Sequence, residues 1–395
     1  MMNFLSDDMR RNPYPAYEQL RSRSPVLHEP HADLWMLFDY EGVKRALNDH
    51  DAFSSVVAPP TAMTSQWLVF ADPPRHTRLR GLIMRAFTPR AVASLEPRLQ
   101  ELSRELLAPA LERGELDLSE DFSVPLPLIV IAEMLGAPAV DRPRFKRWSD
   151  VIMALGYALS GGEEAARVQS EFAAVTAEMR GYVADLAEQR RAAPKDDLLT
   201  RLVEAEVEGE RLTQDELLGF FQLLLSAGHE TTTNLINNAI LCLIENPGQL
   251  ARLRAEPRLL ASAIEEVLRY RSPVQAMFRM SKRDIPLHGQ VIPAGKMVMA
   301  MIGSANRDPL KFRDAERFDI TRDPNPHIAF GHGIHFCIGA PLSRLEARIA
   351  LSTFLERVKG FELASDAPWE PRRAIHVHGP AHLPIRLLER EAPAH

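Results

Sequence analysis

The sequence contains only two cysteines and no long apolar run. Cys242 and Cys337 cannot build a disulfide framework, which favours a reducing compartment, and we expect a cytoplasmic protein. The longest apolar stretches, at 124–132 and 239–244, fall far short of the roughly 18–20 residues that a membrane-spanning helix needs. Residues 1–11 lack the apolar core of a secretory signal, so we expect neither secretion nor a membrane anchor.

An excess of basic residues is also lacking. Lysine and arginine number 47 and aspartate and glutamate 53, so the formal net charge is −6, which argues against nucleic acid as a partner. Hydrophobic residues make up 46% and charged residues 25%, a composition that excludes disordered and fibrous proteins. The 30 prolines are scattered and mark no linker. We therefore predict a single domain over residues 1–395.

Hydrophobic spacing predicts a mainly α protein with small β regions (α+β). Between residues 74 and 256, apolar side chains recur at intervals of three and four, the period of amphipathic helices. Elsewhere the pattern predicts helices over 15–22 and 40–48, a hairpin of 25–28 and 35–38, and strands near 291–293, 297–301 and 383–388. Residues 302–330 show few regular signals and are expected to form an irregular meander.

One predicted helix is long enough to cross a whole domain. It begins with a capping box of Thr213 and Glu216 and continues to about Glu245, where Asn-Pro-Gly stops it. A polar stripe follows one face of this helix and comprises Gln222, Ser226, Glu230, Thr233 and Asn237. Such a stripe is either a solvated face or a polar file inside the protein, beside a site that handles water or protons. The sequence leaves both interpretations open.

The segment 330–339 reads Phe-Gly-His-Gly-Ile-His-Phe-Cys-Ile-Gly and precedes a helical pattern over 340–358. A thiol just before a helix start has a lowered pKa, because the backbone N–H groups and the helix dipole stabilise the thiolate. The two phenylalanines would exclude water, so a metal is the obvious positive partner for Cys337. Zinc bound by His332, His335 and Cys337 stays an alternative, although a structural zinc site usually has four ligands.

This segment resembles the cysteine loop of the cytochromes P-450, whose pattern is F-x-x-G-x-H/R-x-C-x-G, and every specified position matches. Three further motifs occur in the family's order: Ala-Gly-His-Glu-Thr-Thr at 227–232, Glu-x-x-Arg at 266–269, and Ala-Glu-Arg-Phe at 315–318, where the family usually has proline first. The resemblance covers essentially the whole chain and is closest to the soluble bacterial branch. It implies the cytochrome P-450 fold, a helical lobe around haem with a smaller β-rich lobe.

The resemblance also implies a cofactor site. Cys337 would be the thiolate ligand of the iron in haem b (iron protoporphyrin IX), and O2 would be the co-substrate. The haem propionates would pair with His76, Arg80, Arg279 and His335. His76 and Arg80 are spaced i, i+4, so one helical face can present both to a carboxylate.

Two further groups of residues acquire roles from the resemblance. Glu230 and Thr231 would be the catalytic pair, with Thr231 donating a hydrogen bond during oxygen activation and Glu230 relaying protons from solvent. Glu266, Arg269 and Arg317 would form a buried charge triad that braces the meander before Cys337, since buried charges persist only when paired.

The activity implied is that of a monooxygenase, which inserts one oxygen atom from O2 into a hydrophobic organic substrate by C–H hydroxylation or epoxidation. Apolar residues in the segments that form the family's pocket, such as Trp67, Met153 and Met277, favour a bulky terpenoid, steroid, fatty acid or polyketide. Plain core packing explains these residues equally well.

Because the sequence shows no flavin or iron–sulfur domain, we expect the electrons to come from other proteins. The resemblance implies that these are a ferredoxin and an NAD(P)H-dependent ferredoxin reductase. A basic docking surface is expected to comprise Arg75, Arg78, Arg85, Arg344 and Arg348. Two alternatives stay open. One is a haem peroxygenase driven by H2O2, and the other is the zinc-binding protein.

Overall fold

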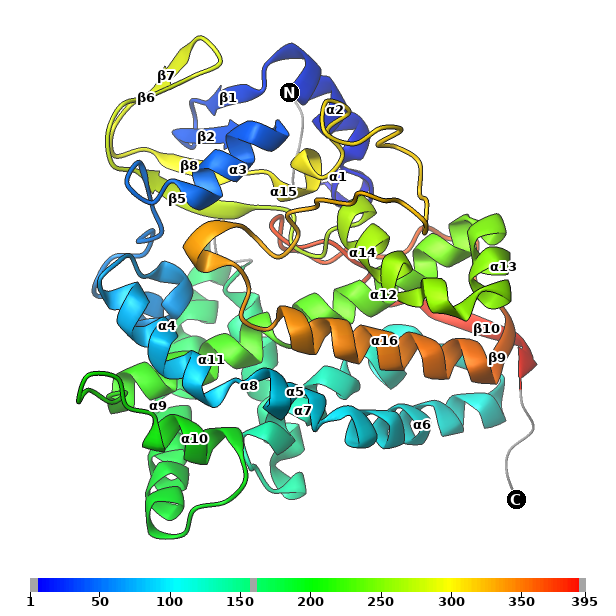
Figure 1. The fold of residues 1–395 in the computed structure, drawn as a ribbon, viewed down its shortest axis with the longest axis horizontal. Helices are drawn as coiled ribbons and strands as arrows, with labels where there is room; N and C mark the ends of the chain where they lie inside the picture. The colour runs from blue at the N-terminus through cyan, green and yellow to red at the C-terminus, as the bar shows by residue number, and fades with distance from the viewer. Residues whose placement is uncertain (1–5, 157–161, 391–395) are drawn as a thin grey trace. The chain divides into compact units, whose positions relative to one another are not determined.

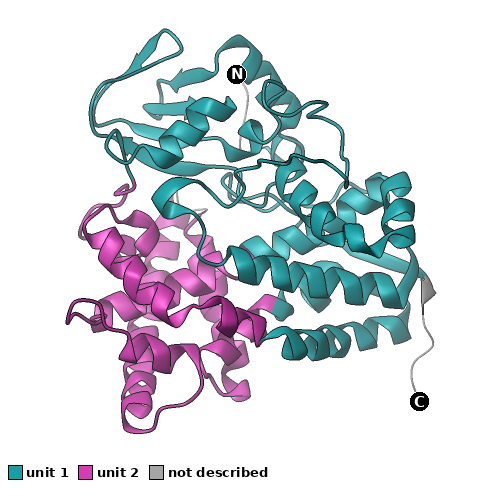
Figure 2. Ribbon diagram, in the orientation of Figure 1, with its two compact units in different colours: residues 1–54, 95–126, 231–395 teal, residues 55–94, 127–230 magenta. Residues whose placement is uncertain are grey.

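The computed structural model describes residues 6–156 and 162–390 (Figure 1). The chain forms two compact units, shown in teal and magenta in Figure 2. Unit 1 comprises residues 1–54, 95–126 and 231–395, and unit 2 comprises residues 55–94 and 127–230. Neither unit is one continuous stretch of chain, because both combine segments that lie far apart in the sequence.

Within the described residues, all strands belong to unit 1. They are β1 (Val26–Glu29), β2 (Leu34–Leu37), β3 (Phe53–Ser54), β4 (Glu115–Asp117), β5 (Met277–Ser281), β6 (Ile285–Leu287), β7 (Gln290–Ile292), β8 (Met297–Ala300), β9 (Val358–Leu363) and β10 (Pro384–Arg390). The largest sheet has the order β1-β2-β8-β5-β3, in which only β2 and β8 are parallel. The smaller sheets have the orders β4-β10-β9 and β6-β7.

The helices of unit 1 are α1 (Asp7–Arg11), α2 (Tyr14–Arg23), α3 (Tyr40–Asn48), α6 (Glu96–Arg113), α12 (Glu230–Glu245, whose first residue closes unit 2), α13 (Pro247–Ala255), α14 (Leu260–Tyr270), α15 (Ile302–Ala305) and α16 (Ala340–Arg357). Local capping explains where several of them begin and end. The Asp39 carboxylate accepts the Gly42 N–H at 2.9 Å and starts α3, and Gly114 ends α6 in a left-handed conformation with φ 84°. Helices α6 and α16 pack against each other.

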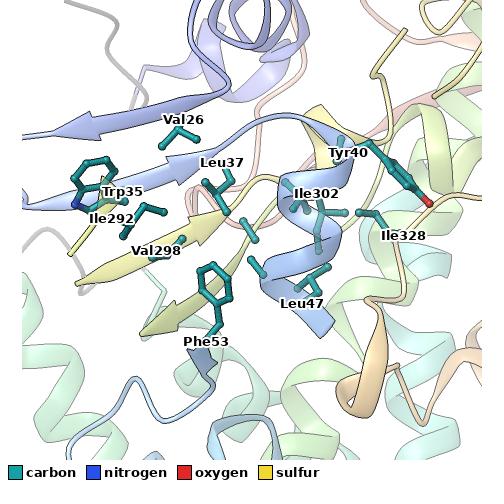
Figure 3. Packing of buried hydrophobic residues seen from close by; sticks show 14 of the residues in the cluster. Val26, Trp35, Leu37, Tyr40, Leu47, Phe53, Ile292, Val298, Ile302 and Ile328 are labelled. Atoms are coloured by element: carbon teal, nitrogen blue, oxygen red, sulfur yellow. The ribbon is translucent and has the colours of Figure 1, made fainter. Parts of the chain in front are cut away.

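A hydrophobic core lies between the largest sheet and α3 (Figure 3). Leu37 of β2 and Val298 of β8 are fully buried there, and Leu47 of α3 is 4% exposed. Ile328, from the end of the meander, belongs to the same core. Burial of each such side chain stabilises the fold by about 1.5–3 kcal/mol. The segment that leads into the cysteine loop is therefore anchored in the core of unit 1.

Unit 2 is helical. It contains α4 (Arg75–Ala86), α5 (Pro89–Ala93), α7 (Pro125–Met134, which begins in unit 1), α8 (Arg142–Ala154), α9 (Gly162–Ala192), α10 (Leu198–Glu204) and α11 (Gln214–Ala227). Aromatic rings from α8, α9 and α11 form its centre. Trp148 lies 5.2 Å from Tyr182 and 6.0 Å from Phe221, measured between ring centroids. Trp148 is fully buried in this packing.

The fold class predicted from the sequence, mainly α with small β regions, is confirmed. The helix over 40–48, the hairpin of β1 and β2 and the strands β7, β8 and β10 lie where the hydrophobic pattern placed them. The meander over 302–330 contains only α15 as regular structure. Strands β3, β4, β5, β6 and β9 were not predicted. Among the helices described, none is long and apolar enough to cross a membrane.

The long helix predicted over 213–245 is wrong as a single element. The capping box of Thr213 and Glu216 is present and starts α11, and α12 ends at Glu245, but Gly228 and His229 separate the two helices. The sequence analysis predicted no interruption, because a glycine in the middle of a helix costs no more than about 1 kcal/mol.

The polar stripe along α11 and α12 is buried rather than solvated. Gln222, Glu230, Thr233 and Asn237 are between 0% and 5% exposed, and Ser226 is half-buried. The Asn237 amide donates to Ser119 Oγ at 2.8 Å, and Thr233 donates to the Ser123 carbonyl at 2.8 Å. Of the two interpretations left open by the sequence, the polar file inside the protein is the one that the structure supports.

Candidate active site

The cysteine loop over 330–339 is a tight backbone turn ahead of α16. The Cys337 N–H donates to the Phe330 carbonyl at 2.9 Å, and the Phe336 N–H donates to the Gly333 carbonyl at 3.0 Å. Helix α16 begins at Ala340, so Cys337 lies just before a helix start, as its sequence context predicted. The unpaired N–H groups of the first turn make this a favourable place for a negatively charged sulfur.

Two glycines give the loop its shape. Gly331 and Gly333 have φ values of +76° and +70°, a left-handed conformation that other residues rarely adopt. A Cβ atom at Gly333 would lie 2.8 Å from Asn48 Oδ1 and 3.0 Å from Asn48 Cα. A side chain at position 333 would therefore push the loop off the end of α3.

Arg344, one turn into α16, links the loop to α14. Its guanidinium lies 4.5 Å from the centroid of the Phe330 ring, and its Nε and Nη2 each donate to the Glu265 carboxylate at 2.7 Å. These hydrogen bonds raise the pKa of Arg344, and the negative charge of Cys337 raises this pKa further. Arg344 thus joins the Phe330 ring of the loop to the carboxylate of α14.

Glu265 also receives a contact from the meander, since His327 Nε2 lies 2.9 Å from its carboxylate. Burial alone would raise the pKa of Glu265, but the hydrogen bonds from Arg344 and His327 outweigh burial and lower this pKa to about 2. The carboxylate is therefore charged at any working pH and ties α14, α16 and the end of the meander together.

A buried charge cluster braces the meander, but its composition differs from the predicted triad. Glu266 and Arg269 pair at 2.8 Å and both are fully buried, as expected. The second arginine on Glu266 is Arg322, at 3.1 Å, whereas Arg317 is exposed and offers only its backbone carbonyl to Arg269. The assignment of Arg317 to the triad is wrong, because the similarity of Ala-Glu-Arg-Phe to the family motif does not show which arginine turns inward.

The remaining predicted cofactor residues of unit 1 lie on two elements. Arg279 is on β5, is 3% exposed and donates through Nη1 to the Phe278 carbonyl at 2.8 Å. His335 ends the short helical turn η7 (Gly333–His335), two residues before Cys337, and is half-buried. Both side chains are partly or wholly withdrawn from water, as groups that bind a carboxylate inside a protein would be.

In unit 2, His76 and Arg80 both lie on α4, one helical turn apart as the spacing predicted. His76 is 2% exposed and Arg80 is half-buried, so neither belongs to an exposed basic helix surface. Glu230 closes unit 2 and is 5% exposed, and Thr231 follows it in the first turn of α12 and is half-buried. The predicted catalytic pair thus lies directly after the interruption at Gly228 and His229.

The zinc alternative has no support in the part of the chain that the structure describes. No three histidine, cysteine, aspartate or glutamate side chains gather there as they would around a metal ion. His332, His335 and Cys337 are close in sequence, but the turns of the loop do not bring them together as three ligands.

The donor set fits a haem. An iron held by a porphyrin needs only one or two axial ligands, and a single cysteine thiolate is one of the known choices. Cys337 is exposed, and the neighbouring Phe336 is 43% exposed. An exposed cysteine beside an exposed phenyl ring suits a flat apolar group, which would cover both of them. The positive charge of Arg344 and the start of α16 suit the thiolate.

One buried carboxyl group near this region was not found from the sequence. Glu346, on α16, is 1% exposed, and its Oε1 has no hydrogen-bond partner among the described residues. Burial raises the pKa of Glu346 to about 8, although a side-chain hydrogen bond with Thr232 of α12 lowers it in part. Glu346 is therefore protonated in the folded protein at neutral pH, and no sequence pattern marks it because its burial results from helix packing.

Replacing Glu346 with glutamine is expected to change how stability depends on pH. The pKa is about 8 in the folded protein against a reference of 4.5, so wild-type stability falls as pH rises from about 4.5 to 8. The Gln variant does not titrate and should gain about 2–4 kcal/mol relative to wild type between pH 5 and pH 8. Equilibrium urea unfolding followed by circular dichroism measures this gain.

The control for Glu346 is Glu112→Gln on the exposed surface of α6, which should change the free energy of unfolding by less than about 0.5 kcal/mol at both pH values. If the pH dependence of Glu346→Gln equals that of the control, the buried carboxyl group is ionised in the folded protein and the inferred protonation is wrong.

The arginines predicted to form a docking surface are largely paired. In unit 1, Arg344 binds Glu265 and Arg348 lies 2.9 Å from Glu96. In unit 2, Arg78 pairs with Glu216 and Arg75 donates to the Ser65 carbonyl at 2.9 Å, whereas Arg85 is exposed. Paired arginines present less net charge than the sequence alone suggested.

Comparison with known proteins identifies the family. The cytochrome P450 family model matches residues 26–371. A putative cytochrome P450, YjiB of Bacillus subtilis, is 44% identical over 91% of this chain and 90% of its own. The vitamin D(3) 25-hydroxylase of Pseudonocardia autotrophica is 39% identical over 97% of this chain and 95% of its own.

A solved structure agrees with these relatives. The crystal structure of CYP109E1 from Bacillus megaterium in complex with testosterone has a TM-score of 0.87 and 40% identity, and the match covers 96% of this chain and all of that one. With the cysteine loop, the helix interruption and the buried charge cluster in place, the chain belongs to the cytochrome P450 family and is a haem- and O2-dependent monooxygenase.

Proposed function

We propose that this monooxygenase hydroxylates or epoxidises a bulky hydrophobic substrate of the steroid class, with haem b bound through Cys337. The observation that carries the proposal is the exposed Cys337 beside the exposed Phe336 just before α16, with Arg344 one turn into that helix. When bound, the haem supplies the activation of dioxygen and the insertion of one of its atoms.

The protein binds this cofactor through charge as well as through the thiolate. Arg344 and the N-terminus of α16 stabilise the negative charge of Cys337. His76, Arg80, Arg279 and His335 would hold the two propionates. Arg279 is 3% exposed, and its permanently charged guanidinium suits a carboxylate that is withdrawn from water.

The catalytic pair would manage protons. The Thr231 hydroxyl can donate one hydrogen bond and accept another, so it can orient a water molecule or a reacting oxygen. Glu230 is buried on the polar face of α11 and α12 and can pass a proton toward Thr231. It can then take up a new proton from polar groups along that face. The protein's contribution to catalysis is this directed proton supply together with the exclusion of other water.

The steroid class is favoured by the relatives. CYP109E1 was crystallised with testosterone, and the relative from Pseudonocardia is a vitamin D(3) hydroxylase. Among the apolar residues predicted to face the substrate, Trp67 instead packs on Phe70 and donates through Nε1 to Gln222 at 3.0 Å, so it belongs to the core of unit 2. Val56 and Met63, which precede Trp67 in the chain, are 45% and 40% exposed and so stay available to a ligand.

A spectroscopic titration tests the proposed substrate class. Adding testosterone to the ferric holoenzyme should shift the iron spin state in a saturable way, and turnover with a ferredoxin and its NAD(P)H-dependent reductase should give a hydroxylated product. A shift with fatty acids but not with steroids would contradict the proposed class. Turnover with H2O2 alone, and none with the ferredoxin system, would identify a peroxygenase instead.

Thr231→Ala is expected to lower the amount of product formed per reduced nicotinamide about 5- to 20-fold, because general acid–base groups contribute 10²–10⁴ and water replaces part of the lost hydroxyl. The electrons should appear as hydrogen peroxide. Thr231→Ser keeps the hydroxyl and should stay within about twofold of wild type. If both variants couple electrons to product equally well, the hydroxyl has no role in proton delivery.

A further inference from the structure

The interruption between α11 and α12 has a specific partner on α8. Helix α11 ends at Ala227, the Gly228 N–H still donates to the Leu224 carbonyl at 3.0 Å, and α12 starts only at Glu230. In a continuous helix, the carbonyl of Leu225 would accept the His229 N–H. Here the hydroxyl of Ser149 lies 3.4 Å from that carbonyl and can donate to it.

The same hydroxyl contacts the imidazole of His229. Ser149 Oγ lies 3.0 Å from His229 Nδ1, and the two residues are 0% and 6% exposed. A serine hydroxyl has one proton, so it satisfies both neighbours when His229 Nδ1 carries a proton and donates to Oγ, while Oγ donates to the Leu225 carbonyl. In this arrangement His229 Nδ1, Ser149 Oγ and the Leu225 carbonyl each have a partner, as buried polar groups require.

Residues of α7 and α8 pack closely around the interruption between α11 and α12. A Cβ atom at Gly228 would lie 2.7 Å from the Leu224 carbonyl oxygen and 3.0 Å from Ile131 Cδ1 of α7, so only glycine fits there. One turn beyond Ser149, Met153 Sδ lies 4.0 Å from the hydroxyl of Ser226. One face of α8 thus contacts the last turn of α11 at two successive positions.

We propose that the hydrogen bond between Ser149 and His229 holds the helix interruption and so positions Glu230 for proton transfer, an inference that rests on the role proposed for Glu230 and Thr231. Ser149 and His229 are positioning residues. They fix the backbone immediately before Glu230, and the direction in which its side chain leaves the helix follows from that backbone.

Two measurements on the holoenzyme test the inference. In Ser149→Ala, amide hydrogen exchange of peptides that cover 224–231 should become about 3- to 10-fold faster, because a lost buried hydrogen bond lowers the local opening free energy. The product formed per reduced nicotinamide should fall about two- to fivefold, with KM within about twofold of wild type. The matched control is Ser103→Ala on α6, also a buried serine, whose hydroxyl has no partner among the described residues.

Two substitutions at His229 separate a hydrogen bond from simple packing. In His229→Asn, the side-chain amide can still donate to Ser149 Oγ, so amide exchange over 224–231 and product per reduced nicotinamide should stay near wild type. In His229→Leu, the side chain fills space but cannot donate, so this variant should behave like Ser149→Ala. Unchanged exchange in Ser149→Ala, or equal behaviour of the Asn and Leu variants, overturns the inference.

The outcome also distinguishes this inference from the proposed function. In one outcome, Ser149→Ala exchanges faster but forms as much product per reduced nicotinamide as wild type, whereas Thr231→Ala forms less. The hydrogen bond then holds the backbone without positioning Glu230, and only this inference fails. If Thr231→Ala itself keeps full coupling, the role proposed for the pair fails, and the positioning role fails with it.

Discussion

Replacing Cys337 with serine is expected to lower oxygenase activity by at least about a hundredfold, since even changes in groups that merely support a metal ligand cost 10- to 100-fold. As an iron ligand, the Cys337 thiolate would supply electron density that favours oxygen activation, which a serine hydroxyl would not replace. The reduced protein under carbon monoxide should also lose the red-shifted absorption band that gives the family its name. Visible spectra and turnover of the two holoenzymes measure both effects.

The other cysteine provides the matched control. Cys242 is fully buried in α12, and burial raises the pKa of its thiol to about 11, so it is neutral and cannot act as a thiolate ligand. Cys242→Ala should keep the spectrum and the turnover of wild type. Removing the buried sulfur atom should lower the stability of the fold only slightly. If Cys337→Ser and wild type share the same spectrum and activity, Cys337 is not the iron ligand.

The second large effect is expected at Arg269. This fully buried guanidinium makes five hydrogen bonds, two to Glu266 and three to the backbone carbonyls of Asn306, Ala315 and Arg317. Arg269→Leu removes the main partner of a buried carboxylate, which typically costs about 3–5 kcal/mol of stability. The meander also loses three anchors, so haem retention during gel filtration should fall together with the midpoint of urea unfolding.

A comparison of Arg322 with Arg317 tests the composition of the charge cluster. Arg322, 10% exposed and 3.1 Å from Glu266, should cost about 1–3 kcal/mol when replaced by leucine. Arg317 is exposed, and Arg317→Leu should cost less than about 0.5 kcal/mol. A larger loss at Arg317 than at Arg322 would mean that the predicted triad was right and that the pairing seen in the structure is wrong.

The sequence could not predict which of these two arginines pairs with Glu266. Both lie in the meander, five positions apart, and no periodic pattern exists there to give either side chain a direction. Similarity to a short motif selected Arg317. The choice of Arg322 depends on the backbone path after Phe318, which Ile320 fixes by its complete burial.

The break between α11 and α12 was also not predictable from the sequence. Capping residues and apolar spacing located both outer ends of the central helical segment, because those signals are local. The residues that lie against the break at Gly228 and His229 are Ser149, 80 positions away from His229, and Ile131. Contacts between residues so far apart leave no mark on the hydrophobic period of either helix.

The sequence by itself determined the mainly helical class from its hydrophobic spacing, and the family and enzyme class from the resemblance of its cysteine loop. The roles of Cys337, Glu230 and Thr231 stay predictions. Only the tertiary structure decided that the polar stripe is buried, that Arg322 rather than Arg317 holds Glu266, and that Glu346 stays protonated. The physical reason is that residue type and spacing fix what a side chain can do, whereas burial and pairing depend on which distant segments pack against it.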